Sequence, residues 1–386
     1  MTVIISKGVF YLCLATLMGY TLLSLIPSAR KPAIHVPRWV IGTSIPLLAL
    51  TLLIPIVSLA RYVAQETGGP FWPILHNILF SFEMGKAWLV ILLLLGGLAS
   101  LYFSRLMEQH KLLRYMAFLL MLGVVFVQGW ASHPSSVEGM LGFLAQSFHV
   151  LAISLWIGTL FIVVWFTPRD TQWLPFLAWF TPLAVSCVLI IIITGVTMMS
   201  FITPYFTQSL ILPYGQMLLI KHVLIVPVLL FGLINGFLLR RRLNTTPSLG
   251  PQRWLRAESG LALGVFAVTA YLTEQAPPHE EVARTFQFTG ASPLFGWFHQ
   301  DAIDPGQISV MFSWWSLFFV TVALIFAVST VLGLRLKSVA MSLASGLLVA
   351  LSLYLAVMMT VHIEPSADFE TNTPNEYIEF GGSFCH

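Results

Sequence analysis

Charged side chains are scarce in this chain of 386 residues, and their scarcity identifies the surrounding solvent. Only 9% of the residues are Asp, Glu, Lys or Arg, whereas a soluble domain carries about 25%. Hydrophobic residues make up 57% of the sequence, which is more apolar side chain than a soluble core could bury. The composition therefore excludes an ordinary soluble domain and indicates that lipid surrounds most of the protein.

Cysteine is also rare, and several familiar patterns are missing. The three cysteines are scattered and form no CxxC pair, so neither a disulfide framework nor a zinc site is indicated. No segments of about ten alternating residues recur, which argues against a β-barrel. The pattern GxxxxGK[ST] is absent as well, so transport would be passive or coupled to an ion gradient or a partner. We expect neither catalytic residues nor an enzyme, and no nucleic acid as a partner.

Long apolar runs are what the sequence has in abundance. A spanning helix needs about 20 mostly apolar residues, and ten segments meet this requirement. They are residues 4–26, 38–62, 87–104, 112–131, 141–167, 174–201, 216–240, 257–275, 308–334 and 338–362. The predicted fold is therefore all-α, a polytopic transmembrane bundle of about ten spanning helices with the lipid bilayer as its partner.

Basic residues occupy alternate loops of this predicted bundle. Fourteen of the 19 lysines and arginines lie in five alternate loops, which hold only three acids, Glu258 among them. Cytoplasmic loops are the ones rich in Lys and Arg. We therefore expect these loops to lie inside and both termini outside, an arrangement that requires an even number of spans.

Histidine and methionine gather towards the opposite, outer side. Thioether sulfur selects Cu(I) and imidazole nitrogen accepts both oxidation states of copper, so we predict a bound copper ion, with Cu(I) favoured and Cu(II) also accepted. Methionine is also ordinary filler in membrane helices, and the sequence does not fix how the helices are rotated. The predicted metal ligands are His133, His149, His222, Met140, Met198, Met199 and Met217.

The segment from residue 128 to residue 158 is the most informative. It places His133 where the fourth span ends and His149 within the fifth span. Gln146 lies one turn before His149 on the same helical face. A metal-binding side chain inside the bilayer is costly and functional by default, and the structural alternative is a hydrogen bond between helices.

The start of the seventh span adds a second group of polar residues. Met217 and Lys221 share one helical face, and His222 is the second intramembrane imidazole. Gln146 and Lys221 are predicted to contribute to a polar pathway, although Lys221 could instead snorkel to the outer interface. Two placements stay open for His222, one facing His149 and one facing the lipid head groups.

Outer loops and the end of the chain hold weaker candidates for metal capture. His279, His299 and His362 each lie beside or close to acidic residues, as in exposed sites for Cu(II) or Zn(II), although a solvated polar loop is the simpler explanation of each. Cys385 and His386 form a soft-metal pair at the end of the chain, which a cloning remnant would explain equally well.

At these residues the sequence resembles the copper resistance protein D family of bacterial inner-membrane proteins. The resemblance covers roughly residues 120–276. It rests on the turn at His133, FHVLAISLWIG from Phe148 to Gly158, the Thr194-Gly195-Val196 step, YGQMLLIKH from Tyr214 to His222, Asn235, and Arg256 with Glu258. The family pattern extends to His133, His149 and Lys221 but assigns no role to His222.

The resemblance implies copper movement across the bacterial cytoplasmic membrane, usually described as uptake. It also implies a soluble extracytoplasmic copper-binding partner, and no such β-domain is present here. We expect one membrane domain over 1–386, with a family-like core at about 120–276, an outer loop at 276–307, two further helices within 308–362 and a polar outward tail at 363–386.

Two other functions stay open at this point. The first is a haem b-binding electron-transfer subunit, since His149 and His222 could supply the two axial ligands. The second is a helical scaffold without metal. The oligomeric state and the direction of transport cannot be derived from the sequence.

Overall fold

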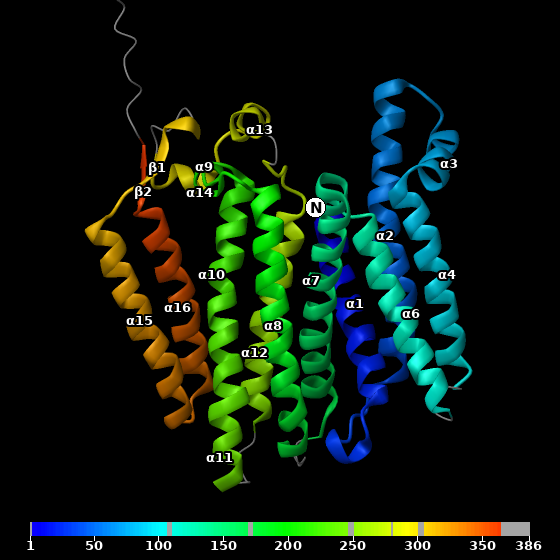
Figure 1. Ribbon diagram of the computed structural model, residues 1–386, viewed down its shortest axis with the longest axis horizontal. Coiled ribbons are helices and arrows are strands. Elements are labelled where there is room, and N and C mark those ends of the chain that lie inside the picture. The colour runs from blue at the N-terminus through cyan, green and yellow to red at the C-terminus, as the bar shows by residue number, and fades with distance from the viewer. Residues whose placement is uncertain are drawn as a thin grey trace, which may run out of the picture.

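The computed structural model describes residues 2–105, 110–168, 173–245, 251–278, 281–299 and 305–363. Ten helices in this part of the chain are long and apolar enough to cross a membrane, which confirms the predicted bundle. The spanning helices are α1 (Thr2–Leu25), α2 (Arg38–Thr67), α4 (Glu83–Phe103), α6 (Lys111–Trp130), α7 (His133–Phe166), α8 (Leu174–Ile202), α10 (Pro213–Leu233), α12 (Gln252–Leu272), α15 (Trp314–Arg335) and α16 (Val339–Met358). The helices lie side by side in a broad bundle (Figure 1).

Short elements cover the two ends of the bundle. One end, at the top of Figure 1, carries α3, α9, α13, α14 and both strands, and α11 lies at the other end. We call the latter the basic end, because its loops contain the residues Arg30, Lys31, Arg105, Arg240–Arg242 and Lys337. The short elements are η1 (Ser28–Arg30), α3 (Phe71–Ser81), α9 (Phe206–Ser209), α11 (Arg240–Thr245), α13 (Val282–Thr289), α14 (Pro293–Gly296), η3 (Pro305–Gln307), β1 (Ile308–Val310) and β2 (Val361–Ile363).

The strands correct the predicted ends of the last two helices. Residues 308–310 and 361–362 were predicted as helix, but β1 and β2 pair antiparallel with Ser309 opposite His362. Both strands are short and rich in the β-branched residues that favour extended backbone. The pairing joins the segment before α15 to the segment after α16 at one end of the bundle. The predicted position of both termini outside stays a prediction.

Two further boundaries differ from the prediction. His133 is the first residue of α7 and does not end the preceding helix, which stops at Trp130. Helix α12 begins at Gln252 rather than at residue 257, so Glu258 lies inside the helix. The prediction began this span late because residues 252–256 contain two arginines, whose charge lowers the hydropathy without preventing helix formation.

Helices α1 and α7 pack together at the centre of the molecule. Their backbones meet at two glycines. A Cβ atom added to Gly158 would lie 1.9 Å from the carbonyl oxygen of Ala15, and one added to Gly19 would lie 2.2 Å from the carbonyl carbon of Gly158. Small residues allow this close approach, which is how helices gain packing contacts where lipid provides no hydrophobic driving force.

Basic side chains at the basic end cap the carboxyl ends of helices. The ammonium group of Lys31 donates to the carbonyl of Leu23 at 2.5 Å, and the guanidinium of Arg242 donates to that of Leu334 at 2.8 Å. Burial lowers the pKa of Lys31, and the charge of Arg114 lowers it further. Cations are favoured at the carboxyl ends of helices because the helix dipole is negative there, so these loops stabilise the bundle as well as defining its charge asymmetry.

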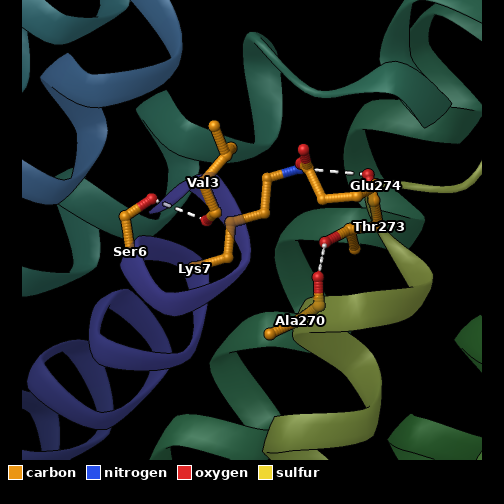
Figure 2. A network of polar contacts seen from close by, with 6 residues as sticks. All are labelled: Val3, Ser6, Lys7, Ala270, Thr273 and Glu274. Atoms are coloured by element: carbon orange, nitrogen blue, oxygen red, sulfur yellow. Dashed lines mark hydrogen bonds and ion pairs between the residues drawn. The ribbon is translucent and has the colours of Figure 1, made fainter. Parts of the chain in front are cut away.

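Lys7 is one of the few basic residues at the opposite end, and its partners explain its position. Its ammonium group forms an ion pair with Glu274 and donates to the carbonyl of Thr273 at 3.0 Å. Figure 2 shows this side chain reaching from α1 to the end of α12. Both members of the pair are about a quarter exposed, so the pair joins two helix ends without contributing a large stabilisation.

Candidate metal site

His149 lies buried in α7 and is oriented by a threonine of the next helix. Its Nδ1 atom is 2.9 Å from Oγ1 of Thr194 in α8. The Thr194 hydroxyl already donates to the carbonyl of Ile190 at 2.6 Å, so its oxygen accepts from His149. The imidazole therefore carries its proton on Nδ1 and keeps a lone pair on Nε2. Metal-binding histidines usually have this arrangement, in which one ring nitrogen donates to a fixed partner and the other binds the metal.

The ring of His149 rests directly against the backbone of α8. A Cβ atom added to Gly195 would lie 3.5 Å from Cε1 of the imidazole. Glycine at this position therefore leaves the ring beside the α8 backbone, within reach of the hydroxyl of Thr194. The sequence analysis noted Thr194 and Gly195 within a family motif but did not include them in the site. The presence of a threonine in a largely apolar segment could have indicated the role of Thr194.

Helix α10 carries the other polar groups that were predicted inside the membrane. Nδ1 of His222 is 2.7 Å from the carbonyl oxygen of Leu218, and a carbonyl only accepts, so this imidazole also keeps its lone pair on Nε2. Helix α10 packs mainly against α12 and α16. Lys221 is half-buried and His222 is exposed at the surface of the bundle. Of the two placements left open for His222, its exposed side chain favours the one facing lipid rather than the one facing the buried His149.

The predicted methionines divide into near and distant positions. Met198 follows Thr194 by one helical turn, and Met217 precedes Lys221 by one turn. Met199 is adjacent to Met198 and is also half-buried. Met140 is 70% exposed and precedes His149 by nine residues of helix, or about 14 Å. Met140 therefore does not share a coordination sphere with His149.

His133 lies still farther along α7. The helix is interrupted between His133 and His149, because Glu138 and Gly139 leave helical geometry and Gly139 has a φ of 51°. His133 is exposed at the first position of α7. The predicted ligands of α7 thus lie along the length of the helix, and Gln146, one turn from His149, is half-buried between them.

Harder metal ligands do not converge in the described part of the chain. No group of three or more His, Cys, Asp or Glu side chains there is close enough to hold a metal ion. A copper ion at His149 would therefore need thioether or backbone ligands beside the imidazole, a set that would suit Cu(I).

The described outer candidates lie near each other. Nε2 of His299 is 3.3 Å from the carbonyl of Met358 and donates to it, which leaves the lone pair on Nδ1. Burial lowers the pKa of His299 from its ordinary value, the hydrogen bond to Met358 opposes this, and nearby His362 lowers the pKa further. His299 lies against the end of α16 and His362 follows in β2, a proximity across 63 positions of sequence that no local pattern could predict. His279, Cys385 and His386 lie outside the described residues.

The sequence analysis also missed a polar pair near the basic end. Glu258 was counted among the loop acids, but it is 2% exposed inside α12. Asn235, in the π-helical segment η2 (Ile234–Leu239), donates to its carboxylate at 2.7 Å. Asn235 and Glu258 are both among the residues that carry the family resemblance. The long apolar stretch that follows Glu258 could have indicated that this acid is buried.

The fold and these sites define a multi-pass α-helical membrane protein with imidazole groups inside its spans. Residues 174–272 match the family model described as copper resistance protein D. The matched segment lies within the region that carries the resemblance found in the sequence and supports that resemblance, and the ten long apolar helices fit a multi-pass membrane protein.

A curated relative supports the same assignment. The chain is 27% identical over 262 residues to the copper transport protein CutJ of Bacillus subtilis (strain 168). This match covers 63% of the chain and 46% of the relative, so the chain spans about half the length of the relative. No solved structure matches the chain significantly.

Proposed function

We propose that this protein handles copper in the bacterial cytoplasmic membrane, either moving it across or accepting it at the outer face. The observation that carries the proposal is the buried imidazole of His149, whose Nδ1 is held by Thr194 while Nε2 keeps its lone pair. The family match and the copper transport relative support the same metal. A carrier needs no catalytic residues, so the role is that of a transporter or acceptor rather than an enzyme.

Copper binding by the purified protein tests this proposal. Detergent-purified protein is expected to take up Cu(I) in a fixed ratio, measured by competition with a coloured chelator and by metal analysis. Its visible spectrum should show no Soret band, since a Soret band would identify haem b bound by His149 and His222. Protein that binds neither copper nor haem would leave only a metal-free scaffold.

Lys221 gives the proposed site a positive neighbour, which has a consequence for affinity. At an effective dielectric constant of about 20, two neighbouring unit charges in a protein repel by on the order of 1–4 kcal/mol. Replacing Lys221 with methionine keeps a long flexible side chain and removes the ammonium group, so Cu(I) affinity is expected to rise by roughly tenfold. We propose that the lysine keeps copper from being held too tightly to leave. Unchanged affinity in the chelator competition would contradict this role.

We propose that His299 and His362 capture copper at the outer face before it reaches the membrane site. The lone pair on Nδ1 of His299 is the donor, and only the neutral imidazole can bind. Because the pKa of His299 is lowered from its ordinary value, more than half of this imidazole is neutral at about pH 6.5, where an unperturbed imidazole is half protonated. Copper capture by the full-length protein is therefore expected to persist at this pH and to decline only in more acidic solution.

The measurement is a copper-binding titration between about pH 7.5 and pH 5. His299→Ala should remove this outer component and leave the binding at His149 intact. His76→Ala serves as the control, because His76 lies at the same end of the bundle on α3 and contacts only Phe80 among the ring contacts of the described residues. A titration curve that is identical in the two variants would contradict the assignment.

We also propose a direction of copper movement and a partner, both from the position of His299 and His362 in the bundle. His299 and His362 lie at the end of the bundle opposite the basic loops. Loops rich in Lys and Arg are typical of the cytoplasmic side, so the two histidines would face outwards. Copper delivered by a soluble extracytoplasmic protein would meet His299 and His362 first and the intramembrane imidazoles afterwards. Uptake of radioactive copper by vesicles of known orientation would test this order.

A further inference from the structure

A cavity of about 200 Å³ lies near the basic end, apart from the histidine site. It is lined by residues of α7, α8, α10, η2 and α12. The rim includes Val185, Leu189, Leu233 and Phe237, which are 43–56% exposed. Because these side chains belong to spanning helices, they face lipid, and the cavity opens sideways towards the bilayer.

The geometry of η2 creates this space. The segment Ile234–Leu239 is a π-helix, and such segments are rare and occur frequently at functional sites. A Cβ atom added to Gly236 would lie 2.9 Å from Cγ2 of Thr181. Glycine therefore lets the wide turn of η2 approach α8 directly, while the polar side chain of Asn235 is directed to Glu258.

Four polar residues line the cavity, and three of them have atoms without a partner. Asn235 donates to Glu258 at 2.7 Å, but its Oδ1 atom accepts no hydrogen bond among the described residues. Oγ1 of Thr181 is likewise buried without a partner in this part of the chain, and Nε1 of Trp156 is directed at the Glu258 carboxylate without meeting the geometry of a hydrogen bond. All four residues are at most 7% exposed. Buried polar groups are normally satisfied, so these atoms indicate a missing ligand.

The lining determines what that ligand must be. It must enter through an apolar rim from the lipid, and it must offer oxygens that accept from Trp156 or Thr181 and that, in a reduced form carrying hydrogen, can also donate to Oδ1 of Asn235. Aromatic rings, including those of Phe180 and Phe237, provide flat apolar surface. We propose that the cavity binds the ring-shaped head group of a membrane-soluble ligand of the quinone or quinol class, independently of the proposed copper site.

Binding of a synthetic quinone tests the proposal. The probe is a 1,4-benzoquinone with a decyl tail, and decylbenzene is the comparison because it lacks the oxygens. Saturable binding is measured with the full-length protein in lipid nanodiscs, after subtraction of partitioning into empty nanodiscs. The quinone is expected to bind at a one-to-one ratio and at least about fivefold more tightly than decylbenzene, the factor of one net hydrogen bond. Absence of saturable binding, or equal binding of the hydrocarbon, would overturn the proposal.

Two matched glycine variants locate the binding. A Cβ atom added to Gly232 would lie 3.6 Å from Oε1 of Glu258, whereas one added to Gly264 would meet nothing within 4 Å. Gly232→Leu should fill the cavity and abolish quinone binding, and Gly264→Leu should leave it unchanged. Copper binding should be normal in both. Equal quinone binding by the two variants would overturn the proposal.

A conservative variant decides the matter if Gly232→Leu disturbs folding. Trp156→Phe keeps an aromatic ring and removes only the indole N–H, so quinone binding should weaken by about five- to tenfold without loss of copper binding. Unweakened binding by Trp156→Phe would show that the indole does not contact the head group and would overturn the proposed site.

Discussion

His149→Ala is expected to abolish tight Cu(I) binding while the protein still inserts into the membrane. The substitution removes the Nε2 lone pair that the contact with Thr194 keeps available. Loss of a residue that merely supports a metal ligand costs about 10–100-fold in affinity, so loss of the ligand itself should cost about 100-fold or more. Insertion should persist because the ten apolar spans, and not one imidazole, determine it.

A series of variants separates the ligand from its support. Thr194→Val conserves volume and removes the hydroxyl that accepts from Nδ1, so it should weaken Cu(I) binding by about 10–100-fold. The affinities are measured by chelator competition on detergent-purified protein. His76→Ala, at the outer end on α3, should bind copper as the unsubstituted protein does. Equal affinity of His149→Ala and His76→Ala would refute the ligand role.

Gly158→Leu is expected to prevent the bundle from assembling. The added Cβ would lie 1.9 Å from the carbonyl oxygen of Ala15, and the contact is with backbone, so no side-chain rotation can relieve it. Overpacking a core with extra methylenes usually costs about 1–3 kcal/mol. Here two helix backbones must separate, and we expect a loss of stability greater than about 3 kcal/mol.

The matched control for this prediction is Gly96→Leu in α4. A Cβ atom added to Gly96 meets nothing within 4 Å, so leucine there should be accommodated against lipid. Thermal unfolding and gel-filtration profiles of the solubilised proteins are the measurements. A Gly158→Leu protein that elutes and melts like Gly96→Leu would show that α1 and α7 do not cross as described.

The spans could be predicted because hydropathy depends on composition alone. Apolar runs of about 20 residues must cross the bilayer as helices, and this decided all ten. The short helix α3 could not be recognised in this way, since 11 residues are too few to cross. The strands β1 and β2 depend on a pairing between distant segments, and neither segment carries enough signal alone.

The site could be predicted only in its chemistry. Sequence placed His149 and His222 inside the membrane, but the rotation of α7 and α10 decides whether they approach each other. Likewise Thr194 could be recognised as polar, but its role depends on which atom its hydroxyl donates to. Glu258 was misplaced because the start of α12 was predicted five residues too late.

X-ray absorption by copper bound to the protein tests the central claim most directly. Cu(I)-loaded protein carrying His299→Ala and His362→Ala, which removes the outer pair, should show imidazole nitrogen among the nearest neighbours of the metal. Adding His149→Ala should eliminate or strongly reduce that signal. A spectrum that is unchanged by the additional substitution would mean that copper binds elsewhere and that the intramembrane imidazole is not its ligand.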